Sequence, residues 1–220
     1  MNNDAILFEA RGPVALLTLN RPDTRNALSG EEVFAAFETT FERLNTDLNI
    51  RAAVLTGAGS AFCSGGNVAE MRDGKGMFGG TPEEIAANYR AGIQRIPRAF
   101  QKLNVPIIAA VNGAAIGAGN DLACMCDIRI ASSTAKFAES FVKLGIVPGD
   151  GGCWLLPRVV GMSRAAELAL TGDAIGAEEA LRIGLVSRVV APEVLLDEAL
   201  ALAARIAANP AQVVRWTKQL

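Results

Sequence analysis

The side chains best suited to chemistry in this sequence are three carboxylates in or near glycine-rich segments. Asp121 ends segment 117–121, Asp150 lies in segment 148–152, and Glu139 stands between them in the chain. Burial raises the pKa of a carboxyl group, which suits it to give and take protons near neutral pH. Aspartates can equally cap helices and turns, so structural roles compete with this one. Asp121 and Asp150 are our first candidates for an acid and a base, ahead of Glu139.

The sequence contains no histidine, which narrows the possible chemistry. Ser-His-Asp and Cys-His arrangements within this chain are excluded, because both need an imidazole. Cys63, Cys124, Cys126 and Cys153 form no C-x-x-C pair. We expect them to be small buried residues in a reducing compartment, and we expect no metal site. Carboxylates, backbone amides, hydroxyls or an external cofactor must carry the chemistry.

Nucleotide-binding motifs are also missing. Segment 57–62 starts as Gly-Ala-Gly but has Phe62 where a dinucleotide fingerprint has its last glycine. No G-K-[ST] phosphate loop occurs. A NAD-dependent reaction is therefore not expected.

Strands and helices alternate along the chain and position these segments. Nearly continuous apolar runs predict strands buried on both faces, at 14–19, 52–56, 105–111 and 127–131. Helical spacing predicts helices from Ser29 to Leu44, from Thr81, from residue 117, and at 163–170, 177–183 and 192–208. The alternation predicts an α/β fold with a largely parallel sheet, in which ligands bind at the carboxyl ends of strands.

Helix ends carry recognisable signals. Ser29 with Glu32, and Thr81 with Glu84, are spaced as capping boxes. Pro97 is expected to kink or split the helix that starts at Thr81. The glycine-rich segment 74–80 is expected to be mobile, either as a lid over a site or as simple surface disorder.

Size and charge limit the class of protein. The chain has 220 residues, of which 50% are hydrophobic and 20% charged, as in a soluble globular protein. The formal net charge is −2 and no segment is dominated by Lys and Arg, so no nucleic-acid partner is expected. No apolar run reaches the roughly 18 residues that span a bilayer. We expect a cytoplasmic protein without a membrane partner.

Several segments agree in order and spacing with a known family. They are Ala61-Phe62-Cys63-Ser64-Gly65-Gly66-Asn67, Val111-Asn112-Gly113 continuing to Gly117-Ala118-Gly119-Asn120-Asp121-Leu122-Ala123, Cys126-Asp127-Ile128-Arg129-Ile130-Ala131, Arg21-Pro22, Asn26-Ala27-Leu28, Leu144-Gly145-Ile146-Val147-Pro148, Ala177-Glu178-Glu179-Ala180 and Gly184-Leu185-Val186. Together they resemble the enoyl-CoA hydratase/isomerase (crotonase) superfamily, from about Ile6 to the end of the chain.

The resemblance implies a fold and an assembly. The fold would be an α/β spiral of ββα units over residues 1–190, followed at 191–220 by the start of a C-terminal helical region. That region is expected to be either shortened or incomplete, because the family usually continues with further helices. A homotrimer or a homohexamer is implied.

The resemblance also implies an acyl-CoA substrate and a site for it. Coenzyme A enters as part of the thioester, and no separate cofactor is implied. The backbone amides of Gly66 and Ala118 would hold the thioester oxygen when it gains negative charge. The substrate would be bound by Arg25, Ala27, Leu28, Ser64, Asn67, Val68 and Phe141. Ser64 is not expected to be a nucleophile, because it has no base.

The chain departs from the hydratase pattern at the proton-transfer groups. The hydratases usually carry two glutamates, which here correspond to the shorter Asp121 and to Phe141. Phe141 cannot transfer a proton, whereas Asp150 matches an aspartate in a similar loop of some relatives. Glu139 lies two positions before Phe141 and is expected to point elsewhere if that segment is helical or extended.

The expected activity is hydration or double-bond migration of an enoyl-CoA, with Asp121 and Asp150 as acid and base. Three alternatives remain from the same fold: thioester hydrolysis, decarboxylation and ring cleavage. A fourth is an acyl-CoA binder without catalysis. The acyl pocket could be shaped by Phe62, Met71, Met77, Phe78 and Phe141, although their spacing fits an ordinary core equally well.

Overall fold

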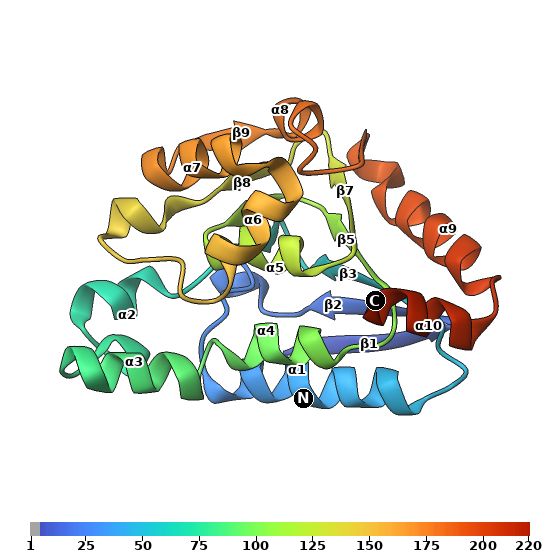
Figure 1. Cartoon of the computed structure of the whole chain (residues 1–220), viewed down its shortest axis with the longest axis horizontal. Coiled ribbons are helices and arrows are strands. Elements are labelled where there is room, and N and C mark those ends of the chain that lie inside the picture. Colours follow the sequence, from blue (N-terminus) through green and yellow to red (C-terminus); the bar gives the residue numbers. More distant parts are fainter. Residues whose placement is uncertain (1–4) are drawn as a thin grey trace.

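The computed structural model describes residues 5–220, and within that range the strands form two sheets. The larger sheet has the strand order β1-β2-β3-β5-β7-β10 and the smaller one β4-β6-β8-β9 (Figure 1). The strands are β1 (Ile6–Arg11), β2 (Val14–Leu19), β3 (Ala52–Gly57), β4 (Ala61–Cys63), β5 (Ile107–Val111), β6 (Ala114–Ile116), β7 (Ile128–Ser132), β8 (Lys136–Ala138), β9 (Ala174–Gly176) and β10 (Arg188–Val190).

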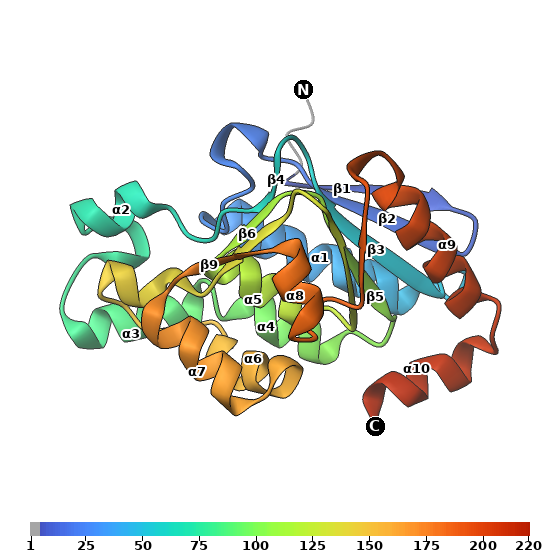
Figure 2. The same ribbon diagram turned by 90° about the horizontal axis from the view of Figure 1, so that it is seen from above.

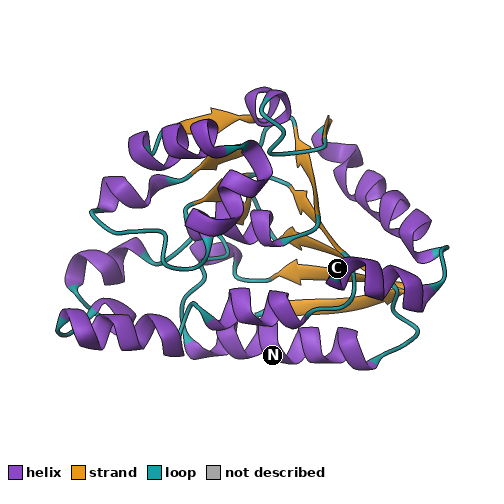
Figure 3. Ribbon diagram, viewed as in Figure 1, coloured by secondary structure: helices purple, strands orange, loops and turns teal. Residues whose placement is uncertain are grey.

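Helices surround the two sheets (Figure 3). They are α1 (Glu31–Thr46), α2 (Val68–Asp73), α3 (Pro82–Ala91), α4 (Arg95–Lys102), α5 (Ala118–Met125), α6 (Gly152–Val160), α7 (Met162–Thr171), α8 (Ala177–Arg182), α9 (Leu195–Ala207) and α10 (Ala211–Gln219). Short 3₁₀ helices span Pro22–Thr24, Gly76–Phe78, Ser140–Leu144 and Pro192–Val194.

Successive turns of the chain give one strand to each sheet. β3, β5 and β7 pair in parallel in the larger sheet, while β4, β6 and β8 pair in parallel in the smaller one. One or more helices follow each such pair of strands. The chain therefore winds as a spiral of ββα units, and the predicted α/β class and largely parallel sheet are confirmed.

The central strands β2, β3 and β5 of the larger sheet are buried on both faces, as their apolar runs predicted, whereas the edge strand β1 is largely exposed. Side chains alternate between faces along a strand, so Leu17 and Leu55 pack with α1 and α4, whereas Leu16 and Val54 pack with α9. Figure 2 shows α1 and α9 on opposite sides of this sheet. Within residues 5–220, no helix is both long and apolar enough to cross a bilayer.

Several local predictions can be compared with the structure. The Thr81 capping box is present: its hydroxyl accepts from the Glu84 amide, and the Glu84 carboxylate accepts from the Thr81 amide. The capping box predicted for Ser29 is wrong. α1 starts one residue later, with Gly30 at its N-cap and no side-chain cap, and Glu32 pairs with Arg21 instead.

The helix predicted from Thr81 is split, as expected. α3 ends at Ala91 and α4 begins at Arg95, which places Pro97 in the first turn of α4. A proline is tolerated there because the first amides of a helix have no partner within it. The cysteine prediction is correct for Cys63, Cys124 and Cys126 but wrong for Cys153, which is exposed.

Candidate active site

Two loops meet because the short strands before them are paired. β4 and β6 are parallel, with Ala61 opposite Ala114 and Cys63 opposite Ala115, so both loops leave the same edge of the smaller sheet. A Cβ atom at Gly65 would lie only 3.3 Å from the Ala118 nitrogen. The absence of a side chain at Gly65 therefore lets the first loop lie directly against the N-terminus of α5.

The amides of Gly66 and Ala118 are unpaired at this meeting point. Neither N–H group donates a hydrogen bond to an acceptor in residues 5–220. Ala118 is the first residue of α5, where the helix dipole favours negative charge, and the Met71 methyl group packs against Gly66. Two unpaired amides on adjoining loops can donate to one oxygen that gains negative charge.

The predicted substrate-binding residues flank the same loops. The Ser64 hydroxyl donates to the Thr24 carbonyl at 3.1 Å. The Arg25 carbonyl accepts from the Ser64 amide at 2.9 Å, and the Leu28 amide donates to the Gly65 carbonyl at 2.8 Å. Segment 24–28 is thus fastened along the first loop, with Arg25 exposed and with Ala27 and Leu28 buried.

Asn67 and Val68 begin α2 beyond the first loop. The Asn67 side chain accepts from the amides of Ala69 and Glu70 and so caps the helix. Val68 is exposed and borders an apolar cavity described below. The structure therefore gives Asn67 a structural task at the edge of the site.

Asn26 belongs to the motif Asn26-Ala27-Leu28 but was given no role of its own from the sequence, yet it holds this region together. Its Nδ2 donates to the carbonyls of Ala58, Ala61 and Phe62, while its Oδ1 accepts from the Arg21 amide. It is buried, with a positive φ of 58° that asparagine tolerates better than most residues. The available sequence signal was that Asn26 stands in the motif Asn26-Ala27-Leu28, which carries part of the family resemblance.

The three carboxylates converge beneath the loops. Asp121, Glu139 and Asp150 are 0%, 1% and 3% exposed. The Asp121 carboxyl lies within hydrogen-bonding reach of both others. Glu139 does not point elsewhere, because the sharp 3₁₀ segment Ser140–Leu144 begins only after it. The structure thus brings together Asp121 and Asp150, the two predicted proton-transfer residues, and Glu139, the less favoured candidate.

Few donors reach these carboxylates. Asn120 Nδ2 donates to Glu139 Oε2 at 3.0 Å. Within residues 5–220, no other residue's N–H or hydroxyl donates to the side chain of Asp121 or Asp150, or to Glu139 Oε1. The carboxyl groups themselves can be partners only when protonated, so at least one proton must be shared. In the same range, no group of three or more acidic or cysteine side chains is arranged to hold a metal ion.

Burial is the main cause of the electrostatics of the cluster. It raises the pKa of Asp121 well above its usual range, and the charges of Asp150 and Glu139 raise it further. Burial also raises the pKa of Glu139 to about 7, against the hydrogen bonds from Asn120 and Asp121 that lower it. The pKa of Asp150 is raised by burial as well. These pKa values suit proton transfer near neutral pH.

Gly152 makes the convergence possible. A Cβ atom there would lie 2.5 Å from Asp121 Oδ2 and 2.5 Å from Glu139 Oε1. In the sequence, the Gly151-Gly152 pair indicates only a glycine-rich loop. The loop itself is fixed from the other side, because Gln94 Nε2 donates to the Gly149 carbonyl at 2.8 Å and Tyr89 packs on Gly149.

Phe141 lies beside the amides rather than among the acids. A Cβ atom at Gly117, the residue before Ala118, would be 3.7 Å from the Phe141 ring, and Phe141 is buried. It therefore forms an apolar wall near the N-terminus of α5.

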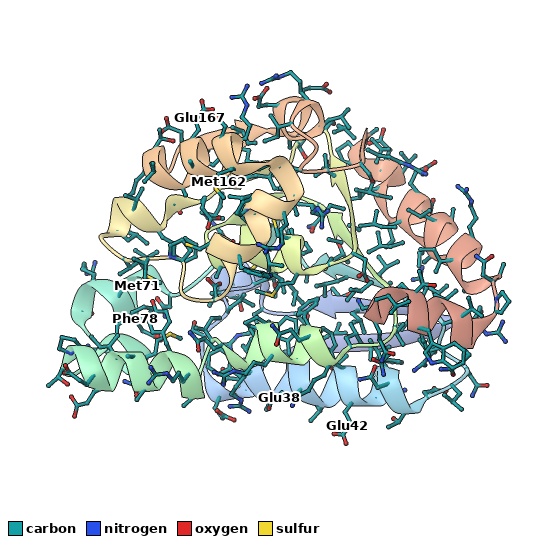
Figure 4. All side chains as sticks on the ribbon, viewed as in Figure 1. Glu38, Glu42, Met71, Phe78, Met162 and Glu167 are labelled. Atoms are coloured by element: carbon teal, nitrogen blue, oxygen red, sulfur yellow. The ribbon has the colours of Figure 1, made fainter. Side chains whose placement is uncertain are left out.

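An apolar cavity of about 390 Å³ adjoins this region. It is lined by Val68, Met71, Arg72, Phe78, Ile85, Tyr89, Leu144 and Ile146. Figure 4 shows Met71 and Phe78 close together at the α2–α3 end of the molecule. Of the five residues suggested for an acyl pocket, Met71 and Phe78 line this cavity, whereas Phe62 is fully buried in the core. Segment 74–80 contains a 3₁₀ helix, Gly76–Phe78.

Comparison with known proteins decides the family. The sequence model of the family described as enoyl-CoA hydratase/isomerase matches residues 9–220. The chain belongs to the enoyl-CoA hydratase/isomerase family. A short-chain-enoyl-CoA hydratase from Clostridium acetobutylicum is 40% identical over 220 residues, which are 100% of this chain and 80% of that protein.

Other relatives within the enoyl-CoA hydratase/isomerase family differ in named activity. A 1,2-epoxyphenylacetyl-CoA isomerase from Escherichia coli is 40% identical over 205 residues, 93% of this chain and 77% of the relative. The crystal structure of an enoyl-CoA hydratase from Bacillus anthracis superimposes with a TM-score of 0.89 at 35% identity, covering 98% of this chain and 81% of that one. The protein is thus a crotonase-fold acyl-CoA enzyme of the hydratase or isomerase kind.

Proposed function

We propose that the protein hydrates, or shifts the double bond of, an enoyl-CoA thioester, with Asp121 and Asp150 as its acid and base. The observation that carries this proposal is the pair of buried, adjoining aspartates beside two unpaired backbone amides. Phe141 stands where hydratases usually have their second glutamate, so Asp150 takes that place.

The amides of Gly66 and Ala118 would stabilise the enolate. When a nucleophile adds to C3, or a proton leaves C2, negative charge develops on the thioester oxygen. Fixed donors meet that charge without reorganising, and each contributes about 2.7–4 kcal/mol to a transition state of this kind. The N-terminus of α5 adds a favourable field at Ala118.

Two carboxyl groups suffice for the proton transfers. In hydration, the ionised aspartate takes a proton from water as the water oxygen bonds to C3, and the protonated aspartate gives its proton to C2. The two groups can then exchange a proton directly, because they lie within hydrogen-bonding reach. In isomerisation, one ionised carboxylate removes a proton from C2 of a 3-enoyl thioester and returns it to C4 of the dienolate.

Binding of the thioester would involve the residues around the loops. We infer that Arg25, Ala27, Leu28 and Ser64 lie along the coenzyme A portion and that Asn67, Val68 and Phe141 border the acyl portion. We also infer assembly into a homotrimer or homohexamer, as in the family. Exposed apolar side chains on α6 and α7, such as Trp154 and Met162, support such contacts, and the mass measured by light scattering tests them.

Product analysis tests the proposed reaction. The protein is incubated with crotonyl-CoA, a longer 2-enoyl-CoA and a 3-enoyl-CoA, followed by chromatography and mass spectrometry. A gain of one water from a 2-enoyl substrate identifies a hydratase, and interconversion of isomers at constant mass identifies an isomerase. Release of free coenzyme A indicates thioester hydrolysis instead. Binding without any product from these or other acyl-CoA substrates refutes the catalytic assignment.

A further inference from the structure

Glu139 has a defined place at one end of the carboxyl cluster. Its Oε2 accepts from Asn120 Nδ2 at 3.0 Å, which fixes the orientation of the carboxyl group. Its Oε1 faces Asp121, since both Oε1 and Asp121 Oδ2 would lie 2.5 Å from a Cβ atom at Gly152. Asp150 approaches Asp121 as well and also acts electrostatically on Tyr89, which lines the apolar cavity.

The side of Glu139 away from Asp121 faces α6 and α7. It borders a small cavity of about 150 Å³ between α6 and α7 that is lined almost entirely by apolar side chains, among them Leu156, Met162 and Ala165. Met162 lies beside α6 and α7 in Figure 4. Cys153 and Met162, which also line this cavity, are exposed, so the cavity opens to the surface. Among the described residues, no side chain of α6 or α7 donates a hydrogen bond to Glu139. Glu139 therefore has Asn120 and Asp121 as its partners.

We propose that Glu139 is a positioning residue that keeps Asp121 protonated and thereby makes Asp121 the acid and Asp150 the base. This inference rests on the proposed function and assigns the two roles within it. Glu139 would act through Asp121 without touching the substrate.

The assignment follows from the donors available to each acid. Glu139 receives a hydrogen bond from Asn120, whereas neither Asp121 nor Asp150 receives one from another residue of 5–220. Of these two, Asp121 is the one within hydrogen-bonding reach of both other carboxyl groups. An ionised Asp121 would have no hydrogen-bond donor and would lie between two other carboxylates, whose negative charges would repel it. Ionisation of Asp121 is therefore less favourable than ionisation of either neighbour. A protonated Asp121 can donate its hydrogen to Glu139 or Asp150 and relieve the repulsion.

The groups that face Glu139 are consistent with an ionised Glu139 beside a protonated Asp121. From α5 these are Asn120, Asp121 and the Cys124 thiol, and from the loop before α6 Asp150. α6 adds the exposed Cys153 thiol, and the other side chains that α6 and α7 give to this wall are apolar. Burial raises the pKa of Glu139 to about 7, so this group is ionised above neutral pH, where its charge holds the pKa of Asp121 high.

The variant Glu139→Gln tests the proposal because it keeps the shape of the side chain and an oxygen for Asn120 but removes the charge. Removing a neighbouring charge should lower the pKa of Asp121 by about one unit or more. We expect the alkaline limb of the kcat profile to move to lower pH by that amount, with kcat at lower pH within about threefold of wild type. Glu42→Gln is the matched control, since Glu42 lies on the exposed face of α1 (Figure 4).

A second measurement needs no substrate and so separates this inference from the proposed function. Infrared spectroscopy of the unliganded protein follows the carbonyl stretch of protonated carboxyl groups, with the Asp121 band assigned by its loss in Asp121→Asn. We expect this band to disappear at lower pH in Glu139→Gln than in the wild type or in Glu42→Gln. An unchanged titration of that band would overturn the proposal. So would a kcat profile reduced by one factor at every pH, because that is the behaviour of a merely structural residue.

Discussion

At the scale of residues, the site depends on what is missing as much as on what is present. Gly65 lets the first loop approach Ala118, and Gly152 leaves the space in which three carboxyl groups meet. The sequence identified Asp121 and Asp150 correctly as neighbours in one site, because both stand in glycine-rich segments. Glu139 was the less favoured candidate, because residue spacing alone does not show that a strand and a 3₁₀ helix turn its side chain toward Asp121.

Gly152→Ala tests the importance of this space. The added methyl group would collide with Asp121 and Glu139 and push the carboxyl groups apart. When the acid and the base are displaced, the rate enhancement from general acid–base catalysis is lost. We therefore expect kcat to fall by about 10²-fold or more. Gly176→Ala is the control, because nothing lies within 4 Å of a Cβ atom there and its φ is an ordinary −84°. Equal kcat values for the two variants would contradict the crowding at Gly152.

At the scale of elements, the long buried strands were predictable, whereas the largely exposed edge strand β1 and the short strands were not. The apolar runs of β2, β3, β5 and β7 are buried on both faces and gave clear signals. β4, β6, β8 and β9 have three residues each, too few for a period to emerge, and they form the smaller sheet. The pairing of β4 with β6 that joins the two loops therefore came from the structure.

The α2–α3 region should set the acyl specificity. Phe78 lines the apolar cavity and packs edge-on against Tyr89, with 5.9 Å between ring centroids. Phe78→Ala enlarges the cavity, so we expect the kcat/KM ratio of decenoyl-CoA to crotonyl-CoA to rise about tenfold. Trp216→Ala removes an exposed aromatic on α10 and should leave this ratio unchanged. No difference between the variants would show that the acyl chain lies elsewhere.

At the scale of the whole molecule, the buried acids link stability to pH. Their pKa values are raised in the folded state, so the folded protein binds more protons than the unfolded chain between about pH 4 and pH 7. The contribution of these acids to the free energy of unfolding is therefore fully present below their pKa values in the unfolded chain. It is lost as the pH rises through their pKa values in the folded protein. Glu139 alone, raised from 4.5 to about 7, accounts for up to about 3 kcal/mol.

Urea unfolding at pH 5 and at pH 8 measures this linkage. We expect the free energy of unfolding to be lower at pH 8, and the difference to shrink in Glu139→Gln, which has no charge to bury. A free energy that is equal at both pH values, or higher at pH 8, would show that the cluster does not hold its protons in the folded protein.

The central claim is that Asp121 and Asp150 move the protons of the reaction. It is tested most directly by kcat for Asp121→Asn, Asp150→Asn and the wild type on the enoyl-CoA that the wild type turns over best. Asparagine keeps the size of each side chain but cannot exchange protons at these pH values. We expect each variant to bind the thioester with an affinity near that of the wild type and to lose about 10²–10⁴-fold in kcat. Turnover at the wild-type rate by both variants would contradict the claim.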